Sequence, residues 1–187
     1  MSRTLSLLNR QRVRRIDTRL LRQITLHLLD TELGVESFEL AIHLVGAEEM
    51  AKVNWDFLQH EGSTDVITFD HSDVVAADVR RLSNKKGGAV AQKSLHGELF
   101  ICLDDAVKQA REFRTTWTQE LTRYVVHGVL HLRGHDDLAA GPRRKMKREE
   151  NRLVRGLAAN FPFSALEKSA TQGGGAKPLA RKRRIKT

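Results

Sequence analysis

The residues of this chain with the clearest potential for chemistry are two histidines, His127 and His131, in the segment YVVHGVLHLRGHDDL. A spacing of four places both imidazoles on one face of a helix, one turn apart. Valines and leucines surround them, which predicts that this helix is largely buried. Neutral imidazoles held on a rigid apolar helix suit a metal ion, so the pattern predicts a metal site.

The residues after this helix offer a third metal ligand. Gly134 can adopt the left-handed conformation that ends many helices, so the chain can fold back at this point. Three residues with metal-binding groups then follow, namely His135, Asp136 and Asp137. By residue type alone, each of the three is a candidate.

Other interpretations suit the same pair of histidines. The chain has eight histidines, so a pair at this spacing can arise by chance and can consist of hydrogen-bonded core residues. Zinc proteases carry a glutamate directly after the first histidine as general base, and Gly128 occupies that position here. The sequence therefore disfavours a protease, and hydrolysis would need a base from elsewhere or a metal-activated water.

Hydrophobic periodicity predicts that strands alternate with helices along the chain. Asp17 is expected to cap the first helix and Gly34 to end it. Residues 70–95 are polar and are expected to form a long surface loop. The pattern predicts an α+β domain of α/β-like character over residues 1–160, with one small sheet. The expected strands are 4–9, 38–45, 64–69 and 97–103, and the expected helices are 17–33, 47–54, 104–113, 117–133 and 140–158.

Charge and composition narrow the class of protein. The net charge is +9, but residues 168–187 contain seven basic residues and no acidic one. We therefore expect residues 161–187 to be a flexible basic tail, which either holds polyanions or only aids solubility. The single cysteine, Cys102, excludes an intramolecular disulfide framework and cysteine-cluster metal sites. Without a membrane-length apolar segment or a signal-peptide pattern, we expect no membrane association and a cytoplasmic location.

The segment HGVLHLRGHDD resembles the signature H-G-x-L-H-L-x-G-Y-D-H of the YbeY family of bacterial endoribonucleases. It differs from that signature only at His135 and Asp137. Further similarity lies in segments that follow the family's order, and the resemblance covers about residues 4–155. These segments are Asn54 with TDVITF at 64–69, GELFIC at 97–102, and Gln109, Ala110 and Glu120.

The resemblance implies a fold, an activity and a set of partners. The fold would be a small, mostly parallel four-stranded sheet packed by about five helices. The activity would be metal-dependent cleavage of single-stranded RNA, in the maturation of the small-subunit (16S) ribosomal RNA 3′ end and in ribosome quality control. The partners would be ribosomal RNA and the small ribosomal subunit, and the usual ion would be Zn²⁺.

The resemblance also places the third ligand at Asp137, where the family has a histidine. His135 directly follows the glycine and has little chain length in which to turn towards the ion, whereas a carboxylate at Asp137 can bind at a distance similar to that of imidazole. We expect His127, His131 and Asp137 to bind one Zn²⁺ per chain, with Mn²⁺ or Mg²⁺ as alternatives because a carboxylate is a harder ligand. His127 and His131 would be catalytic through the metal, with no separate base assigned.

A second departure from the family leaves two functions to distinguish. The family has a phosphate-contacting arginine where this chain has Leu58. The alternative to an enzyme is therefore a non-catalytic, metal-stabilised ribosome assembly factor that binds ribosomal RNA. Asp65 and Glu98 are candidate polar helpers that equally suit structural roles. The basic residues near the motif could replace the arginine or form a solvated helix face: Arg133, Arg143, Arg144 and Lys145.

Overall fold

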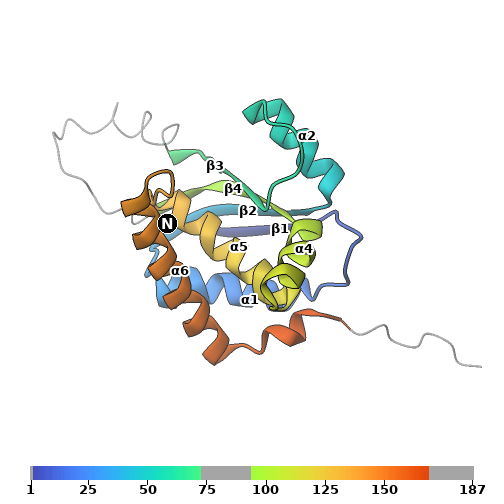
Figure 1. Cartoon of the computed structure of the whole chain (residues 1–187). Helices are drawn as coiled ribbons and strands as arrows, with labels where there is room; N and C mark the ends of the chain where they lie inside the picture. Colours follow the sequence, from blue (N-terminus) through green and yellow to red (C-terminus); the bar gives the residue numbers. More distant parts are fainter. Residues whose placement is uncertain (1, 73–93, 169–187) are drawn as a thin grey trace, which may run out of the picture.

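The computed structural model describes residues 2–72 and 94–168, which form one sheet with helices on both faces (Figure 1). The strands are β1 (Arg3–Asn9), β2 (Ser37–Val45), β3 (Val66–Asp70) and β4 (Ser94–Cys102). The helices are α1 (Thr18–His27) with a wider last turn (Leu28–Glu32), α2 (Ala47–Leu58), α4 (Leu103–Phe113), α5 (Trp117–Leu132), α6 (Ala140–Asn160) and a short 3₁₀ helix (Phe163–Leu166).

The sheet has the strand order β1-β2-β4-β3. β1 pairs with β2, and β2 with β4, in parallel, whereas β3 pairs with β4 in antiparallel orientation. The predicted small, mostly parallel four-stranded sheet is therefore confirmed. β3 is an edge strand, so one of its sides is left for other parts of the molecule to approach.

The two faces of the sheet are covered unequally. In Figure 1, α1, α4, α5 and α6 lie on one side of the sheet, and α2 lies on the other. The side chains of β2 alternate accordingly, and those that face the four helices are buried. Burying an aliphatic or aromatic side chain of this size contributes roughly 1.5–3 kcal/mol, so this layer holds α5 in place. The buried β2 residues of this face are Phe38, Leu40, Ile42 and Leu44.

A glycine lets α5 lie close to the sheet. A Cβ atom on Gly128 would stand 2.7 Å from the Cδ2 atom of Leu99 in β4. Gly128, which directly follows His127, therefore faces the sheet and allows the helix to pack closely against it. A glutamate could take this position only if Leu99 or the helix shifted, which is a structural reason for the absence of a protease-type glutamate here.

Most element boundaries agree with the prediction, with local differences. Asp17 caps α1 as expected, because its carboxylate accepts hydrogen bonds from the backbone N–H groups of Arg19 (2.9 Å) and Leu20 (3.0 Å). The α-helix ends at His27 rather than near residue 33, and the chain widens into a turn before Gly34. α2 extends beyond its predicted end at residue 54, and β4 begins earlier than predicted. Residues 73–93 of the predicted surface loop lie outside the described residues.

The C-terminal boundary is a correction to the prediction. The packed body continues past residue 160, because Leu166 is fully buried and its carbonyl accepts a hydrogen bond from the backbone N–H of Asp17 (2.8 Å). Apolar residues among 161–166 supply the buried surface that a basic tail lacks. The rest of the predicted flexible tail, residues 169–187, lies outside the described residues. No helix in the described part of the chain is long and apolar enough to span a membrane.

Candidate metal centre

Helix α5 places the two histidines with their ring nitrogens facing each other. The Nε2 atoms of His127 and His131 are 3.0 Å apart, and both side chains are about one quarter exposed. The helix is rigid at this point, since Thr116 caps its start and most of its residues are buried. The predicted pairing of two imidazoles on one helix face is thus present.

The turn after α5 brings a carboxylate to the same point. Gly134 has a φ of 81°, the left-handed conformation that ends the helix. The chain then folds back, and the two carboxylate oxygens of Asp137 lie 3.8 Å from Nε2 of His127 and 3.9 Å from Nε2 of His131. Arg143 donates a hydrogen bond to the backbone carbonyl of Asp137 (2.7 Å), which fixes the returning loop.

The other two candidates for a third ligand are engaged elsewhere. The backbone carbonyl of His135 lies 3.1 Å from Nδ1 of His131, while its side chain lines a separate groove on α6. The carboxylate of Asp136 accepts a hydrogen bond from the backbone N–H of Leu138 (2.9 Å). Among the described residues, His127, His131 and Asp137 form the group whose ligand atoms all lie within 4.8 Å of one another.

The hydrogen bonds around the histidines direct their lone pairs inward. Nδ1 of His127 lies 3.1 Å from a carboxylate oxygen of Glu150, and Nδ1 of His131 faces the carbonyl of His135. Both partners accept hydrogen bonds, so each Nδ1 carries the proton and each Nε2 carries a lone pair. Metal-binding histidines are generally oriented by such partners.

The resulting arrangement fits a cation. Two nitrogen lone pairs and a carboxylate face one point, where they repel one another unless positive charge lies between them. Burial and the neighbouring His127 lower the pKa of His131, although Asp137 opposes this, so a proton is a poor substitute for a metal. Tetrahedral Zn²⁺ with bonds of about 2.1 Å separates its ligand atoms by about 3.4 Å, close to the 3.0–3.9 Å found here.

Glu150 is the functional residue that the sequence analysis missed. It lies on α6, is 3% exposed and contacts three cationic or polar partners: His127, Lys147 (2.8 Å) and Arg123. Burial raises the pKa of Glu150, but hydrogen bonds from these partners outweigh burial and lower the pKa to about 2. A signal was present, since Glu150 falls on the apolar stripe of α6, four residues after Met146 and three before Leu153.

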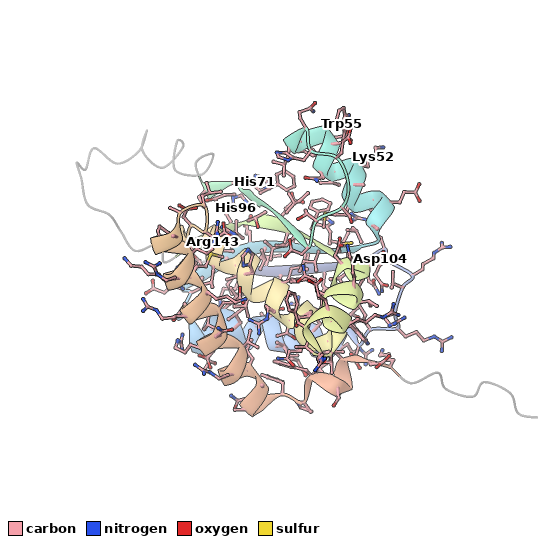
Figure 2. All side chains as sticks on the ribbon, viewed as in Figure 1. Lys52, Trp55, His71, His96, Asp104 and Arg143 are labelled. Carbon is pink, nitrogen blue, oxygen red and sulfur yellow. The ribbon has the colours of Figure 1, made fainter. Side chains whose placement is uncertain are left out.

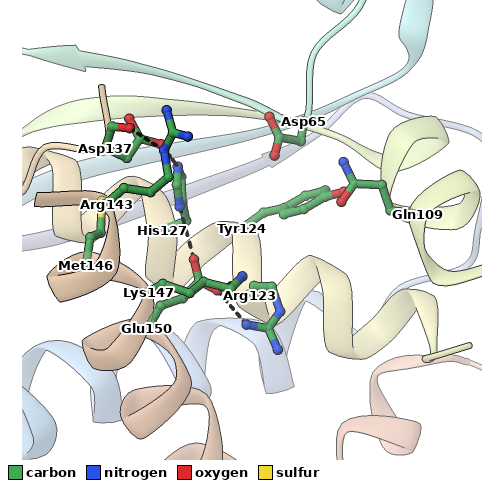
Figure 3. A pocket seen from close by; sticks show the side chains of 10 residues that line it. All are labelled: Asp65, Gln109, Arg123, Tyr124, His127, Asp137, Arg143, Met146, Lys147 and Glu150. Atoms are coloured by element: carbon green, nitrogen blue, oxygen red, sulfur yellow. Dashed lines mark hydrogen bonds and ion pairs between the residues drawn. The ribbon is translucent and has the colours of Figure 1, made fainter. Parts of the chain in front are cut away.

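A cavity of about 190 Å³ adjoins the three candidate ligands (Figure 3). Asp65 lines the wall opposite α6, and Tyr124 lies along the floor with Gln109 near its hydroxyl end. Glu98 lies outside the cavity lining, and its carboxylate contacts His43 of β2 (2.9 Å) and His71, which follows β3 (3.3 Å). Of the two predicted polar helpers, the structure therefore places Asp65 in the cavity and Glu98 outside it.

The basic residues near the histidine motif also divide into those that line the cavity and those that lie elsewhere. Arg143 lines the cavity, and Figure 2 shows it at the start of α6. Arg133 instead donates a hydrogen bond to the backbone carbonyl of Leu33 (2.9 Å). Leu58, at the end of α2, is 48% exposed and is absent from the residues that line the cavity. An arginine at position 58 would therefore not bury a charge.

Comparisons with known proteins show the family of this chain. The sequence profile described as Endoribonuclease YbeY matches residues 6–158. The chain belongs to the YbeY family. It is 31% identical to Endoribonuclease YbeY of Salinibacter ruber over 75% of this chain and 83% of that protein. It is 34% identical to Endoribonuclease YbeY of Chlorobium limicola over 70% of this chain and 78% of that protein.

A solved structure supports the fold. The solution structure of TM1509 from Thermotoga maritima matches with a TM-score of 0.57, over 90% of this chain and 99% of that one, at 22% sequence identity. Membership of the YbeY family makes this chain one of a group of RNA-cleaving hydrolases. The resemblance seen in the histidine motif is therefore confirmed along most of the chain.

Proposed function

We propose that this protein is a metal-dependent endoribonuclease that cuts single-stranded RNA. The observation that carries the proposal is the convergence of three electron-rich ligand atoms, from His127, His131 and Asp137, beside a cavity that Arg143 also lines. Zn²⁺ fits the donor set, and Mn²⁺ or Mg²⁺ are alternatives because one ligand is a carboxylate. His127 and His131 act through the ion that they hold.

The biological role that we propose follows from the family. The substrate is ribosomal RNA, cut near the 3′ end of the small-subunit RNA, and the protein acts in ribosome quality control together with the small subunit. The site of action is the cytoplasm. Residues 1–168 make up the catalytic body, and the basic residues that follow add sequence-independent attraction for RNA.

The chain's own residues have separable tasks in hydrolysis. When bound, a divalent ion supplies a Lewis acid that polarises a phosphoryl oxygen and makes water a better nucleophile. Glu150 holds the proton on Nδ1 of His127, which keeps the Nε2 lone pair available. Arg143 faces the cavity from its rim and can neutralise charge on a phosphate.

Asp65 is the carboxylate of the cavity wall that stays outside the ligand set. One of its oxygens accepts hydrogen bonds from its two chain neighbours, from the backbone N–H of Val66 (2.9 Å) and the hydroxyl of Thr64 (3.1 Å). This fixes the side chain and leaves the other oxygen to accept a proton from the attacking water. A positioned carboxylate in this role contributes about 10²–10⁴-fold to the rate.

A cleavage assay tests the proposal. Protein treated with EDTA and then supplied with Zn²⁺, Mn²⁺ or Mg²⁺ is incubated with an end-labelled single-stranded RNA and with its duplex. We expect cleavage of the single strand only when metal is supplied, and none by His131→Ala. Equal cleavage by His131→Ala would identify a contaminating nuclease and contradict the proposal.

The second candidate function is a ribosome assembly factor that binds metal and RNA without cutting. The observation that favours it is Leu58, an apolar side chain where the family has a phosphate-contacting arginine. RNA binding and metal content that both survive in a protein with no cleavage under any of the three metals would support this function. Metal-dependent cleavage would exclude it.

A further inference from the structure

The basic charge of the folded body is concentrated on one helix. α6 carries seven lysine or arginine residues and two glutamates, whereas the rest of residues 1–167 carries 18 basic residues and 21 acidic ones. The body apart from α6 is thus slightly acidic. A surface with this asymmetry attracts polyanions to one side.

Part of this charge lines a shallow groove on the face of α6 that is turned away from the cavity. The groove, of about 620 Å³, is lined by α6 residues and by His135 of the turn that carries Asp137. Lys145, Arg148 and Arg155 lie along it at helical spacing, so their charges form a stripe about 15 Å long. Figure 2 shows nitrogen-tipped side chains extending outward from α6.

The three cations of the stripe differ from Arg152, the other arginine of the groove, in their ion pairs. Arg152 is neutralised, because it pairs with Glu149 (2.8 Å) and Glu32 (3.0 Å). Lys145, Arg148 and Arg155 have no carboxylate of the described residues within ion-pair distance. Their charges are therefore available to a ligand, while Arg152 fastens α6 to the body.

We propose that this groove binds the phosphate backbone of single-stranded RNA, and that the strand passes from it over the turn of His135 and Asp137 to the metal centre. The inference rests on the proposed function and extends it by naming the surface that holds the substrate outside the cavity. A length of about 15 Å accommodates several phosphates, since stacked nucleotides advance about 3.4 Å each along one strand. Contacts to phosphate by lysine and arginine position a strand without reading its sequence.

The salt dependence of RNA binding tests this assignment. The full chain is compared with a triple variant, Lys145→Gln, Arg148→Gln and Arg155→Gln, by fluorescence anisotropy with a labelled single-stranded RNA in EDTA. Each phosphate contact contributes about 0.7 to the slope of log K against log salt for single strands. We expect the triple variant to lose about 2 from this slope and to bind about 10²-fold more weakly at 50 mM salt.

A matched variant controls for net charge. Arg12→Gln, Lys108→Gln and Arg111→Gln remove the same three charges from exposed positions outside the groove and should leave the slope nearly unchanged. Equal losses in both triple variants would overturn the groove assignment. So would binding of polyglutamate, used as a second probe, that matches RNA in affinity and depends on the same three residues, because the groove would then fit an acidic protein.

The outcomes also separate this inference from the proposed function. If none of the three proteins binds RNA, the proposed function fails. If all three bind RNA with one slope, the proposed function stands and only the groove assignment fails. Glutamine has nearly the helix propensity of lysine and arginine, so all variants should stay folded, and circular dichroism checks this.

Discussion

A carboxylate oxygen of Glu150 lies 3.1 Å from Nδ1 of His127, so helix α6 fixes the ring orientation of a candidate ligand on helix α5. The two residues are 23 positions apart in the sequence. The same carboxylate contacts Lys147 and Arg123, which keep it ionised. The geometry of the candidate metal centre therefore depends on the packing of two helices as well as on the three candidate ligands.

Glu150→Gln should weaken zinc binding by 10–100-fold, because the amide orients His127 less well than a carboxylate does. It should also lower the free energy of unfolding by about 1.5–3 kcal/mol, since Arg123 loses a charge-assisted hydrogen bond and keeps only Glu120 and Asn151 as partners. Zinc titration and urea denaturation measure the two effects. Glu149→Gln is the control, because Glu149 lies on the side of α6 away from His127. It should change zinc affinity and stability much less than Glu150→Gln does.

Tyr124→Phe should leave the stability unchanged or raise it slightly. Tyr124 is 2% exposed, and its hydroxyl has no hydrogen-bond partner among the described residues, so its burial carries an unrecovered desolvation cost. Thr122→Val is the matched variant, because the buried Thr122 hydroxyl donates to the backbone carbonyl of Thr118 (2.9 Å) and its loss should cost about 1 kcal/mol. Thermal denaturation compares them, and a larger loss in Tyr124→Phe would show that the hydroxyl has a partner such as an ordered water.

Cys102 should make the fold more sensitive to alkaline pH. Burial raises the pKa of its thiol from 9.0 to about 12, so between these values the unfolded chain releases a proton that the folded chain keeps. Stability from this group is complete below pH 9 and is lost as the pH rises towards 12. Between pH 8 and pH 10 the wild type should lose about 1 kcal/mol more than Cys102→Ala in urea denaturation. Equal losses in both proteins would contradict the raised pKa.

Leu58→Arg should raise the cleavage rate if an arginine at the end of α2 reaches the RNA phosphate. Because Leu58 is half exposed, the change should alter stability by less than about 0.5 kcal/mol. Single-turnover cleavage of a labelled RNA measures the gain, with Leu58→Gln as a polar, uncharged control. An unchanged rate in Leu58→Arg would show that position 58 does not contact the substrate and would leave Arg143 as the cation at the site.

Local sequence signals predicted much of the fold and the three candidate ligands that the structure brings together. Asp17 caps a helix with its side chain, and Gly134 ends one through its backbone conformation. Both helix ends can therefore be predicted from the residue type alone. His127 and His131 share a helix, and their spacing alone places them together. The turn after Gly134 then brings Asp137 to the two histidines within only three further residues.

The residues that the sequence did not predict depend on contacts between distant elements. Glu150 reaches His127 only because α6 packs against α5. The sequence offered Asp65 and Glu98 equally as polar helpers, and only the fold shows that Asp65 lines the cavity. Leu166 is buried because the chain returns to Asp17 after α6. Composition alone grouped that segment with the basic residues that follow it, so the boundary of the body was set too early.

Metal content is the most direct test of the central claim, which is that Asp137 rather than His135 completes the site. Wild type, Asp137→Ala, Asp137→His and His135→Ala are purified in parallel, and bound zinc is measured by mass spectrometry. We expect about one zinc per chain in the wild type, Asp137→His and His135→Ala, and almost none in Asp137→Ala. Zinc that survives Asp137→Ala and disappears in His135→Ala would contradict this account of the centre.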